Sequence, residues 1–155
     1  MNQSIWAYKS FEWMWEEIAL NKKINHIDIN YNRFPDNTPD TFIENIENDV
    51  EWRDVYYISD LSNLYNLFEN MGTIYGLTRY YSDKVHVIIP FIPVWTMERV
   101  DNEWQIATAK TLARILSSTP SAERWMTRFY TFDIHDLRER FFTSDNVSLK
   151  LLSAM

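Results

Sequence analysis

The sequence contains no cysteine, and this absence removes three kinds of chemistry. Disulfide bonds, thiolate metal sites and cysteine nucleophiles are all excluded. Small extracellular domains commonly depend on disulfides, whereas proteins of the cytosol do not. A cysteine-free chain of 155 residues is therefore predicted to be cytoplasmic, in a reducing compartment.

Glycine is almost as scarce, with only Gly72 and Gly76 in the chain. The sequence has no glycine-rich phosphate loop, no GxGxxG pattern and no GxSxG pattern, so the standard nucleotide-binding and serine-nucleophile motifs are missing. The longest apolar run, 85–95, is interrupted by His86 and two prolines, and it falls well short of the roughly 20 residues that cross a bilayer. We predict no cofactor and no membrane association, and the N-terminus lacks the basic and apolar regions of a signal peptide.

Aromatic residues are abundant, with 7 Trp, 9 Tyr and 9 Phe, and hydrophobic residues make up 46% of the chain. This apolar content is enough for a folded core. The length fits one globular domain over residues 1–155, and we expect the tail from about 145 to fray.

The hydrophobic pattern predicts a mixture of helices and short strands. The predicted helices span about 4–21, 40–51, 60–72, 103–117, 119–130 and 133–142, and the predicted strands 24–31, 55–58, 73–81 and 84–89. Two segments stay ambiguous, because 97–106 fits a hairpin or the start of a helix, and 145–155 fits a strand or a short helix. The interpretation is an α+β fold, with five or six helices packed on a small, mainly antiparallel sheet.

The net charge of −7 comes from one quarter of the chain, since nine acids and a single arginine lie between Pro35 and Asn70. One reading of this segment is a solvated surface that keeps the protein soluble. The other is a docking surface for a basic protein partner, such as the nucleic-acid-binding face of another protein. Direct binding of nucleic acid is disfavoured because basic residues are scattered. The candidate partner-binding residues are Asp40, Glu44, Glu47, Asp49, Glu51 and Asp54.

Two strand-like segments carry histidines, His26-Ile27-Asp28-Ile29 and His86-Val87-Ile88-Ile89. Two histidines that face one cleft can act as general acid and general base on a phosphodiester. The pattern faintly resembles the two-histidine phosphoesterase family, in which a hydroxyl residue follows each histidine two positions later. Asp28 and Ile88 stand at those positions, so both hydroxyls that would bind the phosphate are missing, and the family's activity is not carried over.

The sequence contains no metal-binding pattern such as HExxH, a Cys/His array or a calcium loop. The functional hypothesis is therefore a non-catalytic acidic binding protein, an inhibitor, adaptor or immunity-type protein. Its asparagine- and isoleucine-rich composition is typical of viral or mobile-element genes. The alternative is a small metal-independent hydrolase or phosphoesterase that uses His26, Asp28 and His86.

Overall fold

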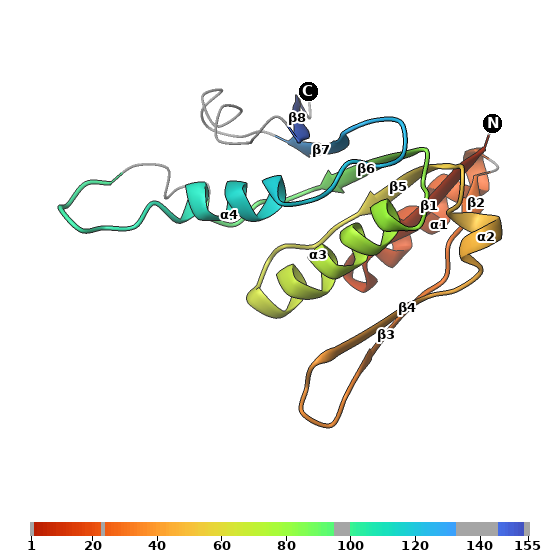
Figure 1. Cartoon of the computed structure of the whole chain (residues 1–155), viewed down its shortest axis with the longest axis horizontal. Helices are drawn as coiled ribbons and strands as arrows, with labels where there is room; N and C mark the ends of the chain where they lie inside the picture. The colour runs from red at the N-terminus through yellow and green to blue at the C-terminus, as the bar shows by residue number, and fades with distance from the viewer. Residues whose placement is uncertain (1, 23, 95–99, 133–145, 154–155) are drawn as a thin grey trace.

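A computed structural model describes residues 2–22, 24–94, 100–132 and 146–153, and its centre is a sheet of six parallel strands (Figure 1). In chain order these are β1 (Gln3–Ala7), β2 (Asn25–His26), β5 (Asp54–Ile58), β6 (Lys84–Ile89), β7 (Thr127–Phe132) and β8 (Val147–Leu152). Across the sheet the order is β2-β1-β5-β6-β7-β8, and every neighbouring pair is parallel.

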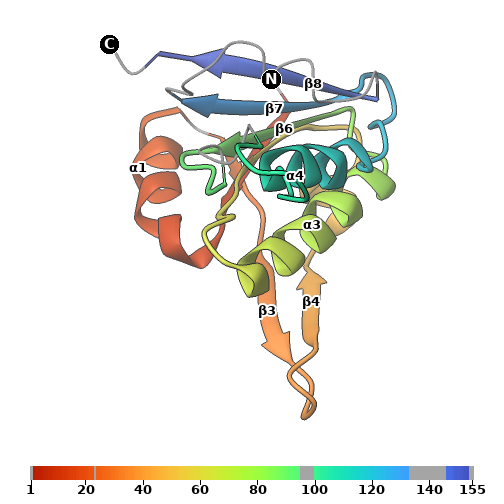
Figure 2. The same cartoon turned by 90° about the vertical axis from the view of Figure 1, so that its left-hand side faces the viewer.

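The two remaining strands, β3 (Ile29–Arg33) and β4 (Pro39–Ile43), pair with each other in antiparallel orientation. They form a hairpin that projects away from the body of the molecule (Figure 2). A two-stranded hairpin has little stability of its own in water. Its position therefore depends on contacts at its base, which are described below.

Helices lie on both faces of the sheet (Figures 1 and 2). They are α1 (Glu12–Lys22), which follows a short 3-10 turn η1 (Lys9–Phe11), α2 (Ile46–Asp49), α3 (Leu64–Arg79) and α4 (Thr108–Ser117). Crossovers between parallel strands are right-handed. Because the chain steps from β1 to β2 in one direction and from β5 to β6 in the other, α1 covers one face while α3 and α4 cover the opposite face. No helix in the described part of the chain is long and apolar enough to cross a membrane.

The core is built from rows of side chains that run across the strands. One row consists of Trp6, Tyr57, Val87, Phe129 and Leu149, which are register partners on five adjacent strands. All five residues are buried, and three of them are fully inaccessible to solvent. Strands of a parallel sheet are covered on both faces, so their sequences are apolar runs with weak alternation.

The predicted α+β class with a small antiparallel sheet is wrong. The structure has a large parallel sheet, and among the described residues it has four α-helices instead of five or six. The segment 73–81, predicted as a strand of a hairpin, continues α3 as far as Arg79. Gly72, predicted to end the helix, lies in its middle, because a helix interior tolerates a single glycine at modest cost.

Several other elements were assigned to the wrong class. The predicted helix 4–21 begins with β1, the predicted helix 40–51 consists of β4 and the short α2, and the predicted helix 119–130 contains the first residues of β7. The strand 55–58, the strand alternative for the C-terminal tail and most of the helix 103–117 are confirmed. The predicted helix 133–142 lies outside the described residues.

Gly72 provides a stability prediction. No heavy atom lies within 4 Å of a Cβ built there, whereas a Cβ at Gly76 would lie 3.4 Å from the Ile43 side chain. We expect Gly72→Ala to raise the free energy of unfolding by about 0.5–1 kcal/mol, because alanine restricts the unfolded chain and favours the helix. Gly76→Ala should gain less. Denaturant unfolding of the wild type and of both variants measures the change in the free energy of unfolding.

Candidate active site at the carboxyl ends of the strands

In an open parallel sheet, ligands bind outside the carboxyl ends of the strands, where the strand order changes direction. In this chain that switch point lies between β1 and β5, because β2 lies on one side of β1 and all the later strands lie on the other. Residues 8–11 follow β1 and residues 59–63 follow β5. The two segments therefore meet at the carboxyl end of the sheet. The backbone joins them directly, since the amide of Tyr8 donates to the carbonyl of Ile58 at 2.8 Å.

Asp60 is the carboxylate at this switch point, and it is only 8% exposed. It accepts hydrogen bonds from the Ser10 hydroxyl at 2.6 Å, the Ser62 amide at 2.9 Å and the Asn66 amide group at 2.8 Å. Burial, the largest single effect, raises the pKa of Asp60, but the hydrogen bonds from these residues together outweigh it and lower the pKa below its ordinary value. The site thus holds a fixed, negatively charged group.

Asn70 fixes the β5–α3 connection through four hydrogen bonds. Its side-chain oxygen accepts from the Tyr57 hydroxyl at 2.6 Å, the Ser59 hydroxyl at 2.9 Å and the backbone amide of Asp60 at 3.1 Å. Its amide nitrogen donates to the Asn66 carbonyl at 2.7 Å. Asn70 is fully buried, so these four bonds satisfy a polar side chain that water cannot reach.

Glu69 is the second carboxylate near this edge, and its side chain is 1% exposed. It accepts a hydrogen bond from the Tyr8 hydroxyl and forms an ion pair with Arg33 at the end of β3. Lys9 lies 3.6 Å from it, with a side chain that is 56% exposed. Burial and the neighbouring Glu69 raise the pKa of Tyr8, so this hydroxyl keeps its proton and remains a donor. Glu69 therefore connects β1, α3 and the hairpin.

An apolar groove of about 330 Å³ lies beside this polar network. Its walls come from the β5–α3 connection, the residues after β6 and the exposed side of α4, and they include Leu61, Asn63, Val94 and Thr108. The carboxyl end of the sheet thus combines fixed hydrogen-bonding groups with an apolar wall, which is the usual composition of a small-molecule site.

No group of three or more His, Cys, Asp or Glu side chains that could hold a metal ion occurs within the residues described. Asp60 is the carboxylate best placed to face a bound ligand, because three donors hold it at the switch point. Lys9 supplies a half-exposed positive charge beside Glu69. This arrangement can orient a polyhydroxylated ligand and attract an anionic one.

The structure does not bring the two candidate histidines together. His26 is on β2, where its ring stacks on Trp15 at 3.9 Å and its Nδ1 lies 3.2 Å from Asp28. His86 is on β6, stacked on Tyr56 at 4.7 Å, with its Nδ1 3.0 Å from the Tyr130 hydroxyl. Strands β1 and β5 lie between β2 and β6, which separates the two by roughly 14 Å at about 4.8 Å per strand.

Protonation of His86 should make the stability depend on pH. Burial, followed by the nearby Arg128, lowers the pKa of His86 below its ordinary value of 6.5. The unfolded chain therefore binds a proton more readily, so stability is fully present above about pH 6.5 and falls as the pH drops toward the folded-state pKa. We expect a smaller loss of thermal stability between pH 7 and pH 5 in His86→Phe than in the wild type. Equal losses would contradict this assignment.

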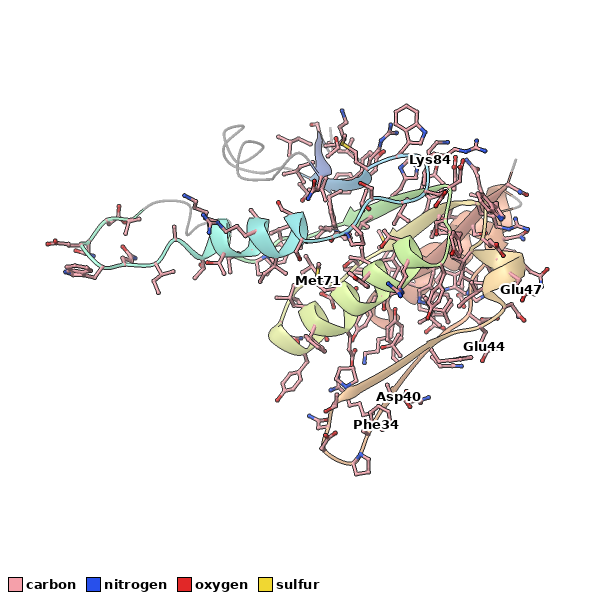
Figure 3. The ribbon with its side chains drawn as sticks, in the orientation of Figure 1. Phe34, Asp40, Glu44, Glu47, Met71 and Lys84 are labelled. Atoms are coloured by element: carbon pink, nitrogen blue, oxygen red, sulfur yellow. The ribbon has the colours of Figure 1, made fainter. Side chains whose placement is uncertain are left out.

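The acids proposed as a partner-binding surface are spread over different elements. Figure 3 shows Asp40 and Glu44 along the hairpin and Glu47 on α2. They do not share one helix face, because 39–43 is a strand. Asp54 is not a free acid, since it lies 3.1 Å from Lys84 on the neighbouring strand.

Sequence reasoning missed most of the residues at the switch point. Asp60 was assigned as a helix cap, but Asn63 caps α3 by accepting from the Asn66 amide. Asn66 and Asn70 are spaced i, i+4 in the helix that follows the buried strand β5 and the Ser59-Asp60 connection. Polar residues on the inward face of a helix that follows a buried strand were the available signal.

A protein-family model described as "N-terminal domain of ribose phosphate pyrophosphokinase" matches residues 4–119, about three quarters of the chain. The chain is 37% identical over 119 residues to "Ribose-phosphate pyrophosphokinase 3, chloroplastic" of Arabidopsis thaliana, covering 77% of this chain and 29% of that protein. It is 35% identical over 137 residues to "Ribose-phosphate pyrophosphokinase 4" of the same plant, covering 85% of this chain and 40% of that protein. The chain thus spans less than half the length of these relatives.

The fold is also found in a crystal structure of phosphoribosylpyrophosphate synthetase from Mycobacterium smegmatis. The TM-score is 0.81 at 16% identity, and the match covers 99% of this chain and 49% of the other. At this identity the likeness concerns the fold, including the parallel sheet.

These matches contradict the hypothesis of a non-catalytic acidic binding protein, whether inhibitor, adaptor, immunity-type or viral. They also contradict the alternative of a hydrolase or phosphoesterase, and nothing in them supports a basic protein partner. The charge pattern misled because acidic surfaces occur on proteins of every function.

Proposed function

Because the chain belongs to the family of the N-terminal domain of ribose phosphate pyrophosphokinase, we propose that it contributes one side of a site that transfers a diphosphoryl group to a ribose phosphate. In such a reaction a sugar hydroxyl attacks a nucleoside triphosphate, the hydroxyl proton is lost and the nucleoside monophosphate leaves. The match to this family over residues 4–119 is the observation that carries the proposal, since it includes the whole network around Asp60.

The chemistry of the switch point suits such ligands. Ribose phosphate offers hydroxyls that donate to a carboxylate, and Asp60 is held charged by three donors that leave part of its acceptor capacity free. Phosphate groups need positive charge, and Lys9 is half exposed beside this network. The apolar groove next to Leu61 and Val94 fits the flat base of a nucleotide.

The compartment remains a prediction. The printed names of two plant relatives place those proteins in the chloroplast and the mitochondrion. We propose a reducing intracellular compartment for this chain on the absence of cysteine.

Lys9 gives the sharpest test of the site. We expect Lys9→Met to weaken binding of a nucleoside triphosphate or of ribose phosphate by roughly tenfold, because one charge contact to phosphate is lost. Stability should change little, since Arg33 still pairs with Glu69. Isothermal titration of the whole chain with each ligand measures the affinities, and coupled detection of nucleoside monophosphate measures turnover.

Lys150→Met is the matched control, because Lys150 is exposed on β8, at the opposite side of the sheet from β1. It should bind both ligands as the wild type does. Absence of binding of both ligands to the wild-type chain would overturn the proposed function, whereas turnover is not required of a chain that supplies one side of the site. Equal affinities of wild type and Lys9→Met would remove Lys9 from the site.

A further inference from the structure

A second groove runs between α3 and α4, and we call it the α3–α4 groove. Its volume is about 470 Å³, and the residues that line it include Phe68, Met71, Tyr75 and Ile115. Figure 3 shows Met71 between the two helices. Two aromatic rings, a thioether and a branched aliphatic side chain thus form a predominantly apolar wall. The volume lies within the range of about 300–1,000 Å³ that is typical of small-molecule sites.

Gly72 gives this groove its depth. It lines the groove from the middle of α3, and no heavy atom lies within 4 Å of a Cβ built on it. Phe68 lies one turn before Gly72 and Tyr75 one turn after it, and their side chains are 67% and 50% exposed. The space over Gly72, with an aromatic side chain on either side of it, can therefore receive a flat ring from outside.

Thr119 places an unpaired polar group in the same groove. It follows α4 by two residues, lines the groove and is only 2% exposed. Its Oγ1 has no hydrogen-bond partner in the part of the chain that the structure describes. The neighbouring Ser118, by contrast, donates to the carbonyl of Ile115 at 2.6 Å. Since buried polar groups are nearly always hydrogen-bonded, a polar atom of a ligand in the groove can supply the partner that Thr119 lacks.

The charge around the groove favours an anionic ligand. Helices α3 and α4 carry three exposed cations, Arg79, Lys110 and Arg114, whereas their only acid, Glu69, is buried. Both helices connect neighbouring parallel strands, so they run in the same direction and bring Arg79 and Thr119 to the same end of the groove. In a protein with a net charge of −7, this is a local excess of positive charge that attracts anions.

From these observations we propose that the α3–α4 groove binds a small aromatic carboxylate. The ring system lies over Gly72 between Phe68 and Tyr75. The carboxylate accepts a hydrogen bond from the Thr119 hydroxyl and is attracted by Arg79. Such a ligand satisfies the unpaired hydroxyl and covers the exposed aromatic side chains at the same time.

This site is separate from the candidate active site. The α3–α4 groove shares Leu67 and Ile115 with the groove beside Asp60, but it contains no residue of the hydrogen-bond network around that carboxylate. The inference therefore does not depend on the proposed function. In particular, Lys9→Met should bind an aromatic carboxylate as the wild type does.

Naphthoate is the probe for the test, and isotope-labelled methionine methyl groups provide the readout by nuclear magnetic resonance. Met71 reports on the groove, and Met14 on α1 is the internal control, because α1 covers the opposite face of the sheet. We expect a saturable shift of the Met71 methyl signal with a dissociation constant below about 1 mM and no shift at Met14. Naphthylmethylammonium has the same ring with a positive charge and should bind roughly tenfold more weakly.

Two variants test the two ends of the ligand separately. Gly72→Leu fills the space over α3 and should weaken naphthoate binding roughly tenfold or more, while the fold is kept because leucine favours a helix over glycine. Thr119→Val keeps the shape of the side chain and removes its hydroxyl. It should weaken naphthoate binding roughly tenfold and leave binding of methylnaphthalene, which has no carboxylate, unchanged. Ser118→Ala is the matched control and should bind both as the wild type does, because the Ser118 hydroxyl is already bonded within α4.

Equal shifts of Met71 and Met14, or an affinity that Gly72→Leu leaves unchanged, would overturn the groove as a ligand site. Equal losses for naphthoate and methylnaphthalene in Thr119→Val would show that the hydroxyl does not bind the carboxylate, and would also overturn the proposal. Circular dichroism establishes that each variant is folded.

Discussion

Replacement of Asn70 by leucine is expected to destabilise the protein by roughly 3–5 kcal/mol, because each buried donor left without an acceptor costs about 1–3 kcal/mol. Three donors lose their acceptor at once, the Tyr57 hydroxyl, the Ser59 hydroxyl and the Asp60 amide. Leucine has the same branched skeleton of side-chain non-hydrogen atoms as asparagine and is bulkier, so no empty space is left and the loss reflects missing hydrogen bonds and tighter packing. Chemical denaturation of the variant and the wild type measures the difference.

The control is Asn48→Leu, since Asn48 is exposed on α2 and its substitution should change stability by no more than about 0.5 kcal/mol. Tyr57→Phe removes one donor and leaves Ser59 and Asp60 bonded to Asn70, while the Tyr31 hydroxyl loses its 3.0 Å contact with Tyr57. We expect it to cost only about 1 kcal/mol. A loss below 1 kcal/mol in Asn70→Leu would mean that water replaces the lost acceptor and that the network does not hold the β5–α3 connection.

The sequence predicted elements best where a strand or helix had a strong local signal. Val55–Ile58 is a run of β-branched and aromatic residues, and Leu112 and Leu116 keep the helical spacing of α4. The failures share a cause. Strand β1 is buried on both faces, so its sequence lacks the alternation that identifies a strand. Burial in β7 alternates between buried and half-buried residues, but both kinds include aromatic residues, which fit a helical stripe as well.

The pairing of the strands could not be predicted from such local signals. Whether β5 and β6 are parallel depends on whether the segment between them is a helix. The prediction of a strand at 73–81 answered that question incorrectly. Once α3 is extended to Arg79, the strand–helix–strand unit implies a parallel sheet. One misread segment therefore changed the predicted class of the whole fold.

The site was missed for a related reason. Asp60, Asn66 and Asn70 come together only because β5 and α3 meet at the switch point, which requires the strand order. The alternative hypothesis of a hydrolase or phosphoesterase was based on histidines, because histidine titrates near neutral pH. In the structure the His86 ring lies between Tyr56 of β5 and Tyr130 of β7, in a row of rings that crosses the sheet.

Glu69 should control the position of the hairpin. Its carboxylate contacts Arg33 at the end of β3 and Tyr8 at the end of β1, so Glu69→Gln removes the charge that holds the hairpin against α3. Breaking a fully buried ion pair costs about 3–5 kcal/mol. Arg33 is 30% exposed and Lys9 56% exposed, and both can be rehydrated, so we expect about 2–3 kcal/mol here.

Amide hydrogen exchange separates this local effect from general destabilisation. In Glu69→Gln, exchange of the β3 and β4 amides should accelerate relative to the wild type, and by more than exchange of the β6 and β7 amides. The reason is that local opening of the hairpin becomes easier than global unfolding. The central strands keep their neighbours on both sides. Uniform acceleration over all strands would mean that Glu69 supports the fold as a whole and does not position the hairpin specifically.

A double-mutant cycle with Arg33→Met isolates the pair from the other contacts of Glu69. We expect a coupling free energy of about 1–3 kcal/mol between the two positions. The pairing of Lys9 with Glu69 at 3.6 Å is longer and more exposed, so the cycle of Lys9→Met with Glu69→Gln should give less than about 1 kcal/mol. The ratio of the two couplings decides whether the hairpin or the β1 turn is the main partner of Glu69. A larger coupling with Arg33 would mean that the hairpin is anchored through the same residue that orients Tyr8 beside the switch point. Movement of the hairpin would then reach the candidate active site through one carboxylate.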